Sequence, residues 1–432
     1  MLKLVKIVKG DIHLFWKKLQ PSIHKPLCET LTFLKWVLFA CIIGLVVGGI
    51  SIAFYYTFGF VTGLRLESDW LLYLLPVGGL AIVLLYKICG VEKDGGTNFV
   101  LLAVRDNAAL PLRTAPLVFI STMITHLFGG SAGREGAILQ IGGSISSSLG
   151  RLIHLDDKDS RIITMCGMSA AFSALFGTPL TAAVFAMEMV SVGVMYYAAI
   201  VPCVVSALVG VFLARLCGIA PTAYAISALP DTTLVLMLQI IALGILCAVL
   251  SAIFCRLMHS SQRLFGKVSS PLLRVALGGA LIILLTLLVG TRDYNGAGGD
   301  IIAEAIGGSA RPEAFLLKMI FTMITLGAGY KGGEIVPVFF IGSTFGCVVG
   351  SLIGLPGAFG AAIGLVSVFC GVTNCPMSSI LLAMELFGGV KMPMFALAIA
   401  VSYMLSGYYS LYSEQKIVYS KTRPIFINRK AE

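Results

Sequence analysis

The sequence places an acid, Glu135, in the glycine-flanked stretch Gly133-Arg134-Glu135-Gly136, directly before an apolar run. A helix is therefore expected to begin here, inside the hydrophobic body of the protein. The first amides of such a helix are unpaired and lie at the positive end of its dipole, so they suit an anion. A carboxylate at this depth is costly unless it is protonated or takes the anion's place. Glu135 is thus predicted to be a gate that competes with an anion when ionised and moves away when protonated. The alternative is a first-turn capping acid.

A second glycine-rich helix start, at residues 332–335, carries Glu334. The amides of residues 134–137 and those of residues 333–336 are predicted to face one site, with a third helix start near Asn98. Cations would be repelled from such a site, because every helix start presents partial positive charge.

The two helix starts belong to a longer repeat. The stretches 179–188 and 376–385 both begin with proline, end with glutamate and share Ala-Met-Glu. Each follows its glycine-rich start at nearly the same distance. Paired repeats with interrupted helices are typical of transporters, which bind their substrate near the middle of the membrane. The alternative is a helical bundle whose glycines only allow close packing.

Three other glutamates are predicted to be structural. Glu188 and Glu385 end the two repeated stretches, where each could accept from a backbone amide or pair with a basic loop. Glu334 is expected to form a local ion pair with Lys331.

The composition is that of a membrane protein. Hydrophobic residues make up 58% of the chain and charged residues 12%, and the mean hydropathy is +0.95. Soluble domains carry roughly 25% charged residues. Residues 31–62, 70–89, 197–216, 234–257 and 272–290 are apolar runs long enough to cross a bilayer. Residues 97–104, 137–149, 179–190 and 376–387 are shorter and bounded by Gly, Pro or Asn, as expected for half-helices. The fold is predicted to be all-α, with tilted and broken helices.

Four segments follow from this pattern: a basic arm at 1–30, a membrane repeat at 31–225, a second repeat at 226–409, and a C-terminal helix and tail at 410–432. The net charge of +10 comes largely from the two ends. The positive-inside rule places both ends in the cytoplasm, with the body in the plasma (inner) membrane. The basic arm lacks the aromatic residues expected of a nucleic-acid surface.

An enzyme is improbable on this sequence. No His-Glu-x-x-His set or nucleophile with an adjacent base occurs, and the five histidines are scattered. His126 is expected to be a core histidine with its hydrogen bonds satisfied. The eleven cysteines show no metal-ligand spacing, so no metal or cofactor is expected.

Together these residues resemble the chloride channel (CLC) family of anion channels and anion/proton exchangers. The resemblance rests on Gly-Arg-Glu-Gly at 133–136, Gly-Gly-x-x-x-Pro at 332–337, both proline-to-glutamate stretches, and Leu411-Tyr412-Ser413. It implies a homodimer with one pore per subunit, inverted repeats and cytoplasmic termini. It also implies Glu135 as the gating residue.

The resemblance further implies which groups surround the anion. It implies Tyr412 as a central ligand, with the amides of Ile335 and Val336 lining the same site, which the helix-start pattern already predicts to be faced by the amides of Arg134 and Gly136. From the residues alone, the favoured interpretation of Tyr412 is an interfacial belt tyrosine, and a hydroxyl that reaches inward to an anion is the alternative.

One departure bears on which ion is carried. Chloride-transporting members have Gly-Ser-Gly-Ile-Pro where this chain has Gly-Gly-Thr-Asn98-Phe99. This resembles the bacterial fluoride/proton exchangers of the family, in which Asn98 would contact the anion and the ring edge of Phe99 would contact a bare halide.

Two further departures bear on the mechanism. Met189 stands where many chloride/proton exchangers have an inner glutamate, which agrees with the fluoride branch. Val336 stands where that branch usually has threonine. Proton-coupled fluoride export is therefore the prediction, with a chloride/proton exchanger or a chloride channel as the alternatives.

Overall fold

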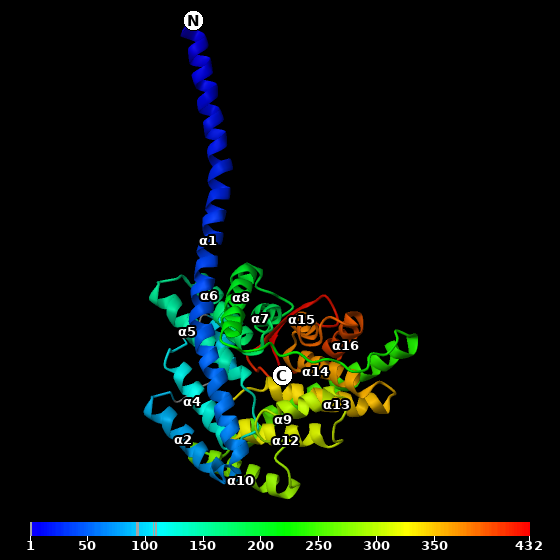
Figure 1. Ribbon diagram of the computed structural model, residues 1–432. Helices are drawn as coiled ribbons and strands as arrows, with labels where there is room; N and C mark the ends of the chain where they lie inside the picture. The colour runs from blue at the N-terminus through cyan, green and yellow to red at the C-terminus, as the bar shows by residue number, and fades with distance from the viewer. Residues whose placement is uncertain (1, 92–94, 107, 109) are drawn as a thin grey trace.

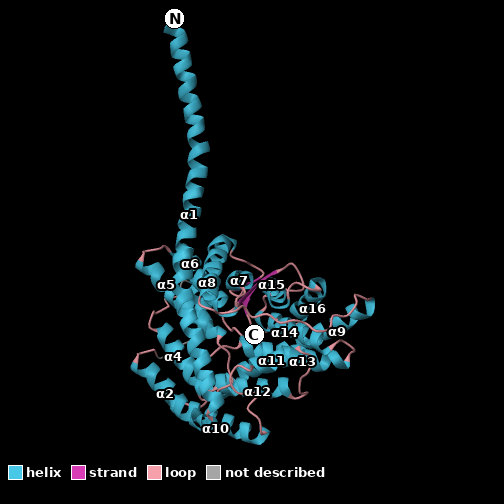
Figure 2. Ribbon diagram, viewed as in Figure 1, coloured by secondary structure: helices cyan, strands magenta, loops and turns pink. Residues whose placement is uncertain are grey.

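The computed structural model describes residues 2–91, 95–106, 108 and 110–432, and their side chains from Cys28 onward. The chain is almost entirely helical (Figures 1 and 2). The first half contains α1 (Leu2–Glu67), η1 (Asp69–Leu74), α2 (Leu75–Ile88), α3 (Thr97–Asp106), α4 (Thr114–Leu127), α5 (Glu135–Leu152), α6 (Asp157–Phe176), α7 (Pro179–Glu188), β1 (Ser191–Val192), η2 (Tyr197–Ala199) and α8 (Ile200–Leu216). The second half contains α9 (Leu234–Gly266), α10 (Pro271–Val289), α11 (Gly299–Ile306), α12 (Ala314–Gly327), α13 (Ile335–Leu352), α14 (Gly357–Thr373), α15 (Pro376–Phe387), α16 (Met392–Leu405), β2 (Lys416–Tyr419) and β3 (Phe426–Lys430).

The order of helices in the second half matches that in the first. Helices α4 and α12 both have 14 residues, and α5 and α13 both have 18. The expected internal repeat of broken helices is thus present. The basic arm expected at residues 1–30 lies largely outside the described side chains.

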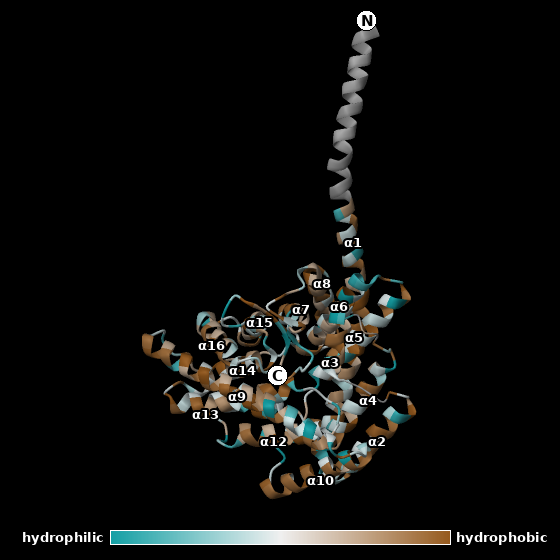
Figure 3. Cartoon of the chain, turned by 180° about the vertical axis from the view of Figure 1, so that it is seen from behind, coloured by the Kyte–Doolittle hydropathy of each residue, from teal (hydrophilic) through white to brown (hydrophobic). Residues whose placement is uncertain are grey.

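Six segments in the described part of the chain are long and apolar enough to cross a bilayer. They are Cys28–Glu67, Asp69–Ile88, Tyr197–Leu216, Leu234–Gly266, Pro271–Val289 and Ile335–Leu352. Outer helices such as α2, α9 and α10 are made up largely of hydrophobic residues, as the brown colouring of the chain shows (Figure 3). Leu234 and Leu288, for example, are each 73% exposed. Such surfaces require a lipid environment.

Glycines allow the inner helices of each half to approach closely. A methyl group on Gly142 in α5 would overlap the carbonyl oxygen of Gly167 in α6. The second half repeats the contact, because a Cβ on Gly342 in α13 would lie 2.6 Å from Gly364 O in α14. Small residues at such crossings bring the backbones together and fix the angle at which α5 and α13 enter the protein.

The prediction of a C-terminal helix within residues 410–432 is wrong. This segment forms the strands β2 and β3, which join β1 in a sheet of order β1-β2-β3. Strand β2 runs parallel to β1, with Ser191 opposite Lys416, and antiparallel to β3, with Lys416 opposite Lys430. The β-branched and aromatic residues of Lys-Ile-Val-Tyr favour a strand, and Pro424 in the connecting turn opposes a helix.

Candidate functional site

The helix starts of the two halves meet directly. Gly133 N donates to Gly333 O at 2.6 Å, and Gly333 N donates to Gly133 O at 2.8 Å. Both positions require glycine, since a Cβ on Gly133 would collide with the Glu135 carboxylate and a Cβ on Gly333 would lie 2.6 Å from Gly136 N. Helices α5 and α13 therefore begin at a common point inside the protein.

The Glu135 side chain crosses from one half to the other at this point. It is fully buried, and its Oε2 accepts a hydrogen bond from the Val336 amide at 3.1 Å. Its Oε1 has no hydrogen-bond partner among the described residues. A carboxylate thus occupies the position before α13 that the free amides and the helix dipole prepare for an anion.

Two cavities approach this carboxylate. Cavity A, of about 580 Å³, is lined by Arg134 and Val336 among others, and cavity B, of about 860 Å³, is lined by Gly136, Glu334 and Tyr412 among others. Arg134 and Gly136, the residues before and after Glu135, therefore line different cavities. Val336 and Glu334, at the start of α13, also line different cavities. The hydrogen bond from Val336 to Glu135 lies in the wall between the two cavities.

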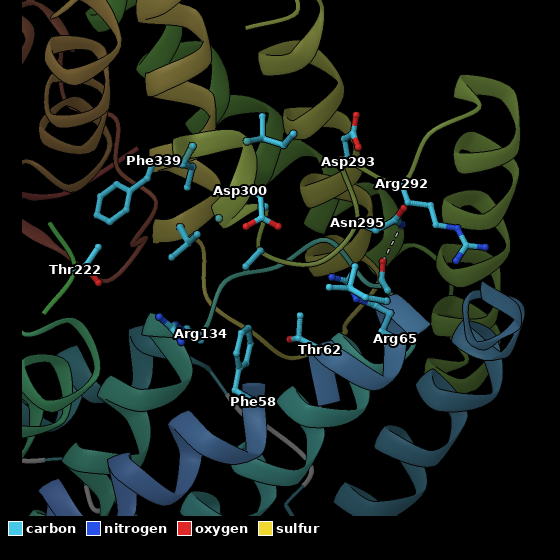
Figure 4. A pocket seen from close by; sticks show the side chains of 18 of the residues that line it. Phe58, Thr62, Arg65, Arg134, Thr222, Arg292, Asp293, Asn295, Asp300 and Phe339 are labelled. Carbon is cyan, nitrogen blue, oxygen red and sulfur yellow. Dashed lines mark hydrogen bonds between the residues drawn. The ribbon is translucent and has the colours of Figure 1, made fainter. Parts of the chain in front are cut away.

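Cavity A is lined by several cationic side chains (Figure 4). Arg292 is neutralised by Asp69, with 2.5 Å between Nη1 and Oδ1. The guanidinium of Arg134 instead lies over three aromatic rings, those of Tyr55, Phe58 and Phe176, at 5.0 to 5.5 Å from their centroids. Aromatic faces hold a guanidinium without cancelling its charge, so Arg134 presents a positive charge to the part of cavity A beside Val336, although Asp293 and Asp300 also line the cavity.

Cavity B holds two hydrogen-bond donors that the sequence singled out. The Tyr412 side chain is 1% exposed, and its hydroxyl has no hydrogen-bond partner within the described chain. Asn98 accepts from the Glu414 amide through Oδ1 at 3.1 Å, which leaves its Nδ2 donors for the cavity. The burial of Tyr412 excludes the interfacial belt position.

The remaining predicted site residues lie further from the two cavities. Ile335 is completely buried, and its side chain lines neither cavity. Phe99 is half-buried against the hydrophobic core and also lines neither. The site therefore has Arg134 and Val336 at one cavity, Gly136, Asn98 and Tyr412 at the other, and Glu135 between the two.

Sequence reasoning did not select Glu334 for the site. Its Oε2 is buried without a hydrogen-bond partner and lies 3.2 Å from where a Cβ on Gly136 would stand. The ammonium group of Lys331 lies over the Tyr86 ring, 4.7 Å from its centroid. The sequence feature that could have identified Glu334 is its position immediately before α13. Arg134 holds the equivalent position immediately before α5 in the first repeat.

Glu188 and Glu385, near the ends of α7 and α15, each cap the start of the corresponding helix in the other half of the chain. Glu188 accepts from the amides of Met377 and Ser378 at 3.0 and 2.8 Å. Glu385 accepts from the amides of Leu180 and Thr181, each at 2.9 Å. Each carboxylate satisfies the free amides at the start of the other half's helix, which confirms their structural role.

His126 also has a structural place, beside the point where the two helix starts meet. Its side chain is 1% exposed, and its Nε2 lies 3.1 Å from Gly133 O. The satisfied core histidine expected from the sequence is confirmed. No group of three metal-ligating side chains occurs among the described residues.

An all-helical membrane body, in which two half-helices meet at a buried carboxylate between two cavities, defines an anion-transporting membrane protein. A family model described as voltage gated chloride channel matches residues 78–407. The chain belongs to this family.

Several relatives and solved structures are similar over most of their length. A protein of Pseudomonas syringae named "Chloride/fluoride channel protein" is 36% identical over 396 residues, which cover 90% of this chain and 87% of that protein. The crystal structure of a CLC-type fluoride/proton antiporter matches with a TM-score of 0.85 and 31% identity, covering 88% of this chain and 97% of the other. A slow cyanobacterial Cl−/H+ antiporter matches with a TM-score of 0.72 and 19% identity, covering 86% and 94%, and shares the fold.

Proposed function

We propose that this protein exchanges fluoride for protons across the membrane and that Glu135 is its gate. The observation that carries the proposal is the 3.1 Å hydrogen bond from the Val336 amide to Glu135 Oε2. A carboxylate in that position stands in for the transported anion, because both are recognised by the free amides at a helix start.

Proton binding and anion binding then exclude each other. When Glu135 is ionised, its carboxylate occupies the amide of Val336 and separates cavity A from cavity B. When it is protonated, it is a weaker acceptor and leaves the amide to the anion. The anion passes between the cavities only while Glu135 carries a proton, so anion flow and proton flow are coupled.

Glu334 is the second carboxylate of this proton path. Its buried, unpartnered Oε2 lies at cavity B, beside the backbone of Gly136. A carboxyl group there can exchange a proton with Glu135 once the Glu135 side chain has left the amide of Val336. Met189 gives no such group at the end of α7.

Fluoride is favoured over chloride by the donors around the path. Fluoride is strongly hydrated, so it enters a protein only where hydrogen bonds replace its water. Cavity B presents the Tyr412 hydroxyl and the Asn98 amide as such donors. The similarity to a fluoride/proton antiporter of 31% identity supports the same ion.

The protein is proposed to act as a homodimer in the plasma (inner) membrane, with both termini in the cytoplasm. Support comes from the basic residues at both ends of the chain and from its family membership. Single-molecule photobleaching in liposomes tests the dimer, and labelling of a cysteine added at position 432 tests the orientation.

The test of the function is a flux assay with purified protein in liposomes. Fluoride efflux is expected to exceed chloride efflux, and an outward fluoride gradient is expected to drive protons inward against their own gradient. Chloride efflux without proton movement would refute the proposal and favour a chloride channel.

A further inference from the structure

Glu414 connects the two donors of cavity B to the C-terminal sheet. It follows Tyr412 by two residues, and its amide donates to Asn98 Oδ1 at 3.1 Å. Its carbonyl oxygen accepts from Arg105 Nη1 at the other end of α3, and its carboxylate lies 3.3 Å from Arg105 Nη2. The same carboxylate pairs with Lys430 in β3 at 2.7 Å. Arg105, Glu414 and Lys430 are called the Glu414 clamp below.

The clamp determines which end of the Asn98 amide is available. A carboxamide has one acceptor end and one donor end. Since the Glu414 amide engages Oδ1, the donor end of Asn98 remains for cavity B, where no described residue accepts a bond from it. An anion is attracted by the donor end and repelled by the acceptor end.

The residue after Glu414 anchors the clamp in the core. Gln415 is fully buried, and its Nε2 donates to Met189 O at 2.9 Å and to Thr373 O at 2.8 Å. Its carbonyl oxygen accepts from the Ala431 amide at 2.9 Å. The peptide between Tyr412 and Gln415 is therefore held by α3 on one side and by the sheet and core on the other.

We propose that the Glu414 clamp is a specificity-determining device: it orients Asn98 and places Tyr412 so that both side chains present hydrogen-bond donors to an anion in cavity B. The clamp residues do not touch the anion, so they are positioning residues. The inference rests on the proposed anion path through cavity B. Under this inference, the C-terminal sheet maintains the selectivity of cavity B for a strongly hydrated anion.

The experiment compares charge-removing variants in the full-length protein in liposomes. E414Q removes the carboxylate charge that pairs with Arg105 and Lys430, while Arg105 keeps its ion pair with Asp106 at 2.8 Å. K430Q removes the Lys430 partner, whose side chain is 58% exposed. The matched control is R429Q, which removes a positive charge from the next position in β3, where Arg429 pairs with Glu432 at 3.3 Å.

E414Q is expected to raise the KM for fluoride by about three- to tenfold, which is the range for the loss of one ordinary hydrogen bond. K430Q is expected to raise it by about twofold, since exposed pairs contribute little. Vmax, the proton-to-fluoride ratio and the melting temperature are expected to stay within error, and R429Q to behave as the parent. In the double variant E414Q/K430Q, the KM should equal that of E414Q alone, because Lys430 acts through Glu414.

An unchanged fluoride KM in E414Q and K430Q would overturn the inference, as would an equal rise in R429Q or additive effects in the double variant. A fall in melting temperature without a change in KM would reduce the clamp to a stabilising contact. The parent protein is measured first, with both halides. If it carries chloride rather than fluoride, the proposed function fails, and the clamp is judged by the KM for chloride with the same variants.

Discussion

The carboxylate of Glu135 accepts a hydrogen bond from the amide of Val336, 201 residues further along the chain, at 3.1 Å. Each half of the protein contributes one partner to this bond. The donor is one of the unpaired amides that every helix start leaves free. The acceptor is a carboxylate, whose charge changes when it binds a proton. Under the proposed function, this one position responds to both the anion and the proton.

Replacing Tyr412 by phenylalanine tests the donor at cavity B. The hydroxyl has no partner within the described chain, so its removal should leave the melting temperature unchanged or slightly raised. Anion affinity should fall by about tenfold, because one charge-assisted hydrogen bond is lost. Isothermal titration with fluoride measures the affinity.

Tyr330 provides the control for Tyr412, since it also lines cavity B. Its hydroxyl donates to Leu75 O at 2.9 Å and lies 3.0 Å from Val275 O. Y330F should therefore lower the melting temperature and leave anion affinity intact. The reverse pattern in the two variants would contradict the placement of Tyr412 beside the anion.

Asn98 can be changed so that only the donor end is altered. Aspartate keeps an acceptor for the Glu414 amide but replaces the donor with a charged oxygen. N98D should reduce fluoride flux by more than about tenfold, since a carboxylate repels the anion. N98S, which keeps a donor, should retain flux with a lower preference for fluoride over chloride. Paired halide-electrode measurements check both, and wild-type flux in N98D would remove Asn98 from the path.

The two capping glutamates should affect stability rather than transport. Glutamine keeps one acceptor oxygen but presents an NH2 group to amides that also donate, so a buried hydrogen bond is lost. E188Q should destabilise the protein by about 1.5–3 kcal/mol, and E385Q by less, because Glu188 is the more buried of the two. Thermal unfolding in detergent measures both effects. A changed proton-to-anion ratio in E188Q would show that its role is not only structural.

The buried position of Glu135 at a helix start and the internal repeat could be predicted from the sequence because both depend on local chemistry. The glycines beside Glu135 indicate a helix start. The pattern shared by the stretches that end in Glu188 and Glu385 indicates the duplication. The bond between Glu414 and Asn98 joins positions 316 residues apart, so no local pattern could reveal it.

The C-terminal segment was predicted wrongly for a related reason. A single short run such as Lys-Ile-Val-Tyr becomes a strand only because β1, far away in the chain, lies beside it. Glu334 was assigned a local role because Lys331 is near it in sequence. Its position beside Gly136 depends on how the two halves pack.

Glu334 is tested by glutamine, which keeps the shape of the side chain and removes its proton exchange. E334Q should retain fluoride binding and lower the number of protons moved per fluoride. Simultaneous recording of fluoride and pH in one liposome suspension gives this ratio. An unchanged ratio would exclude Glu334 from the proton path.

The most direct test of the account is the same dual recording on Glu135→Ala. Without the carboxylate, the Val336 amide is open to the anion at all times, so fluoride should flow down its gradient with no proton movement. A fluoride gradient should then no longer drive protons uphill. If Glu135→Ala still pumps protons against their gradient, Glu135 is not the residue that couples the two flows.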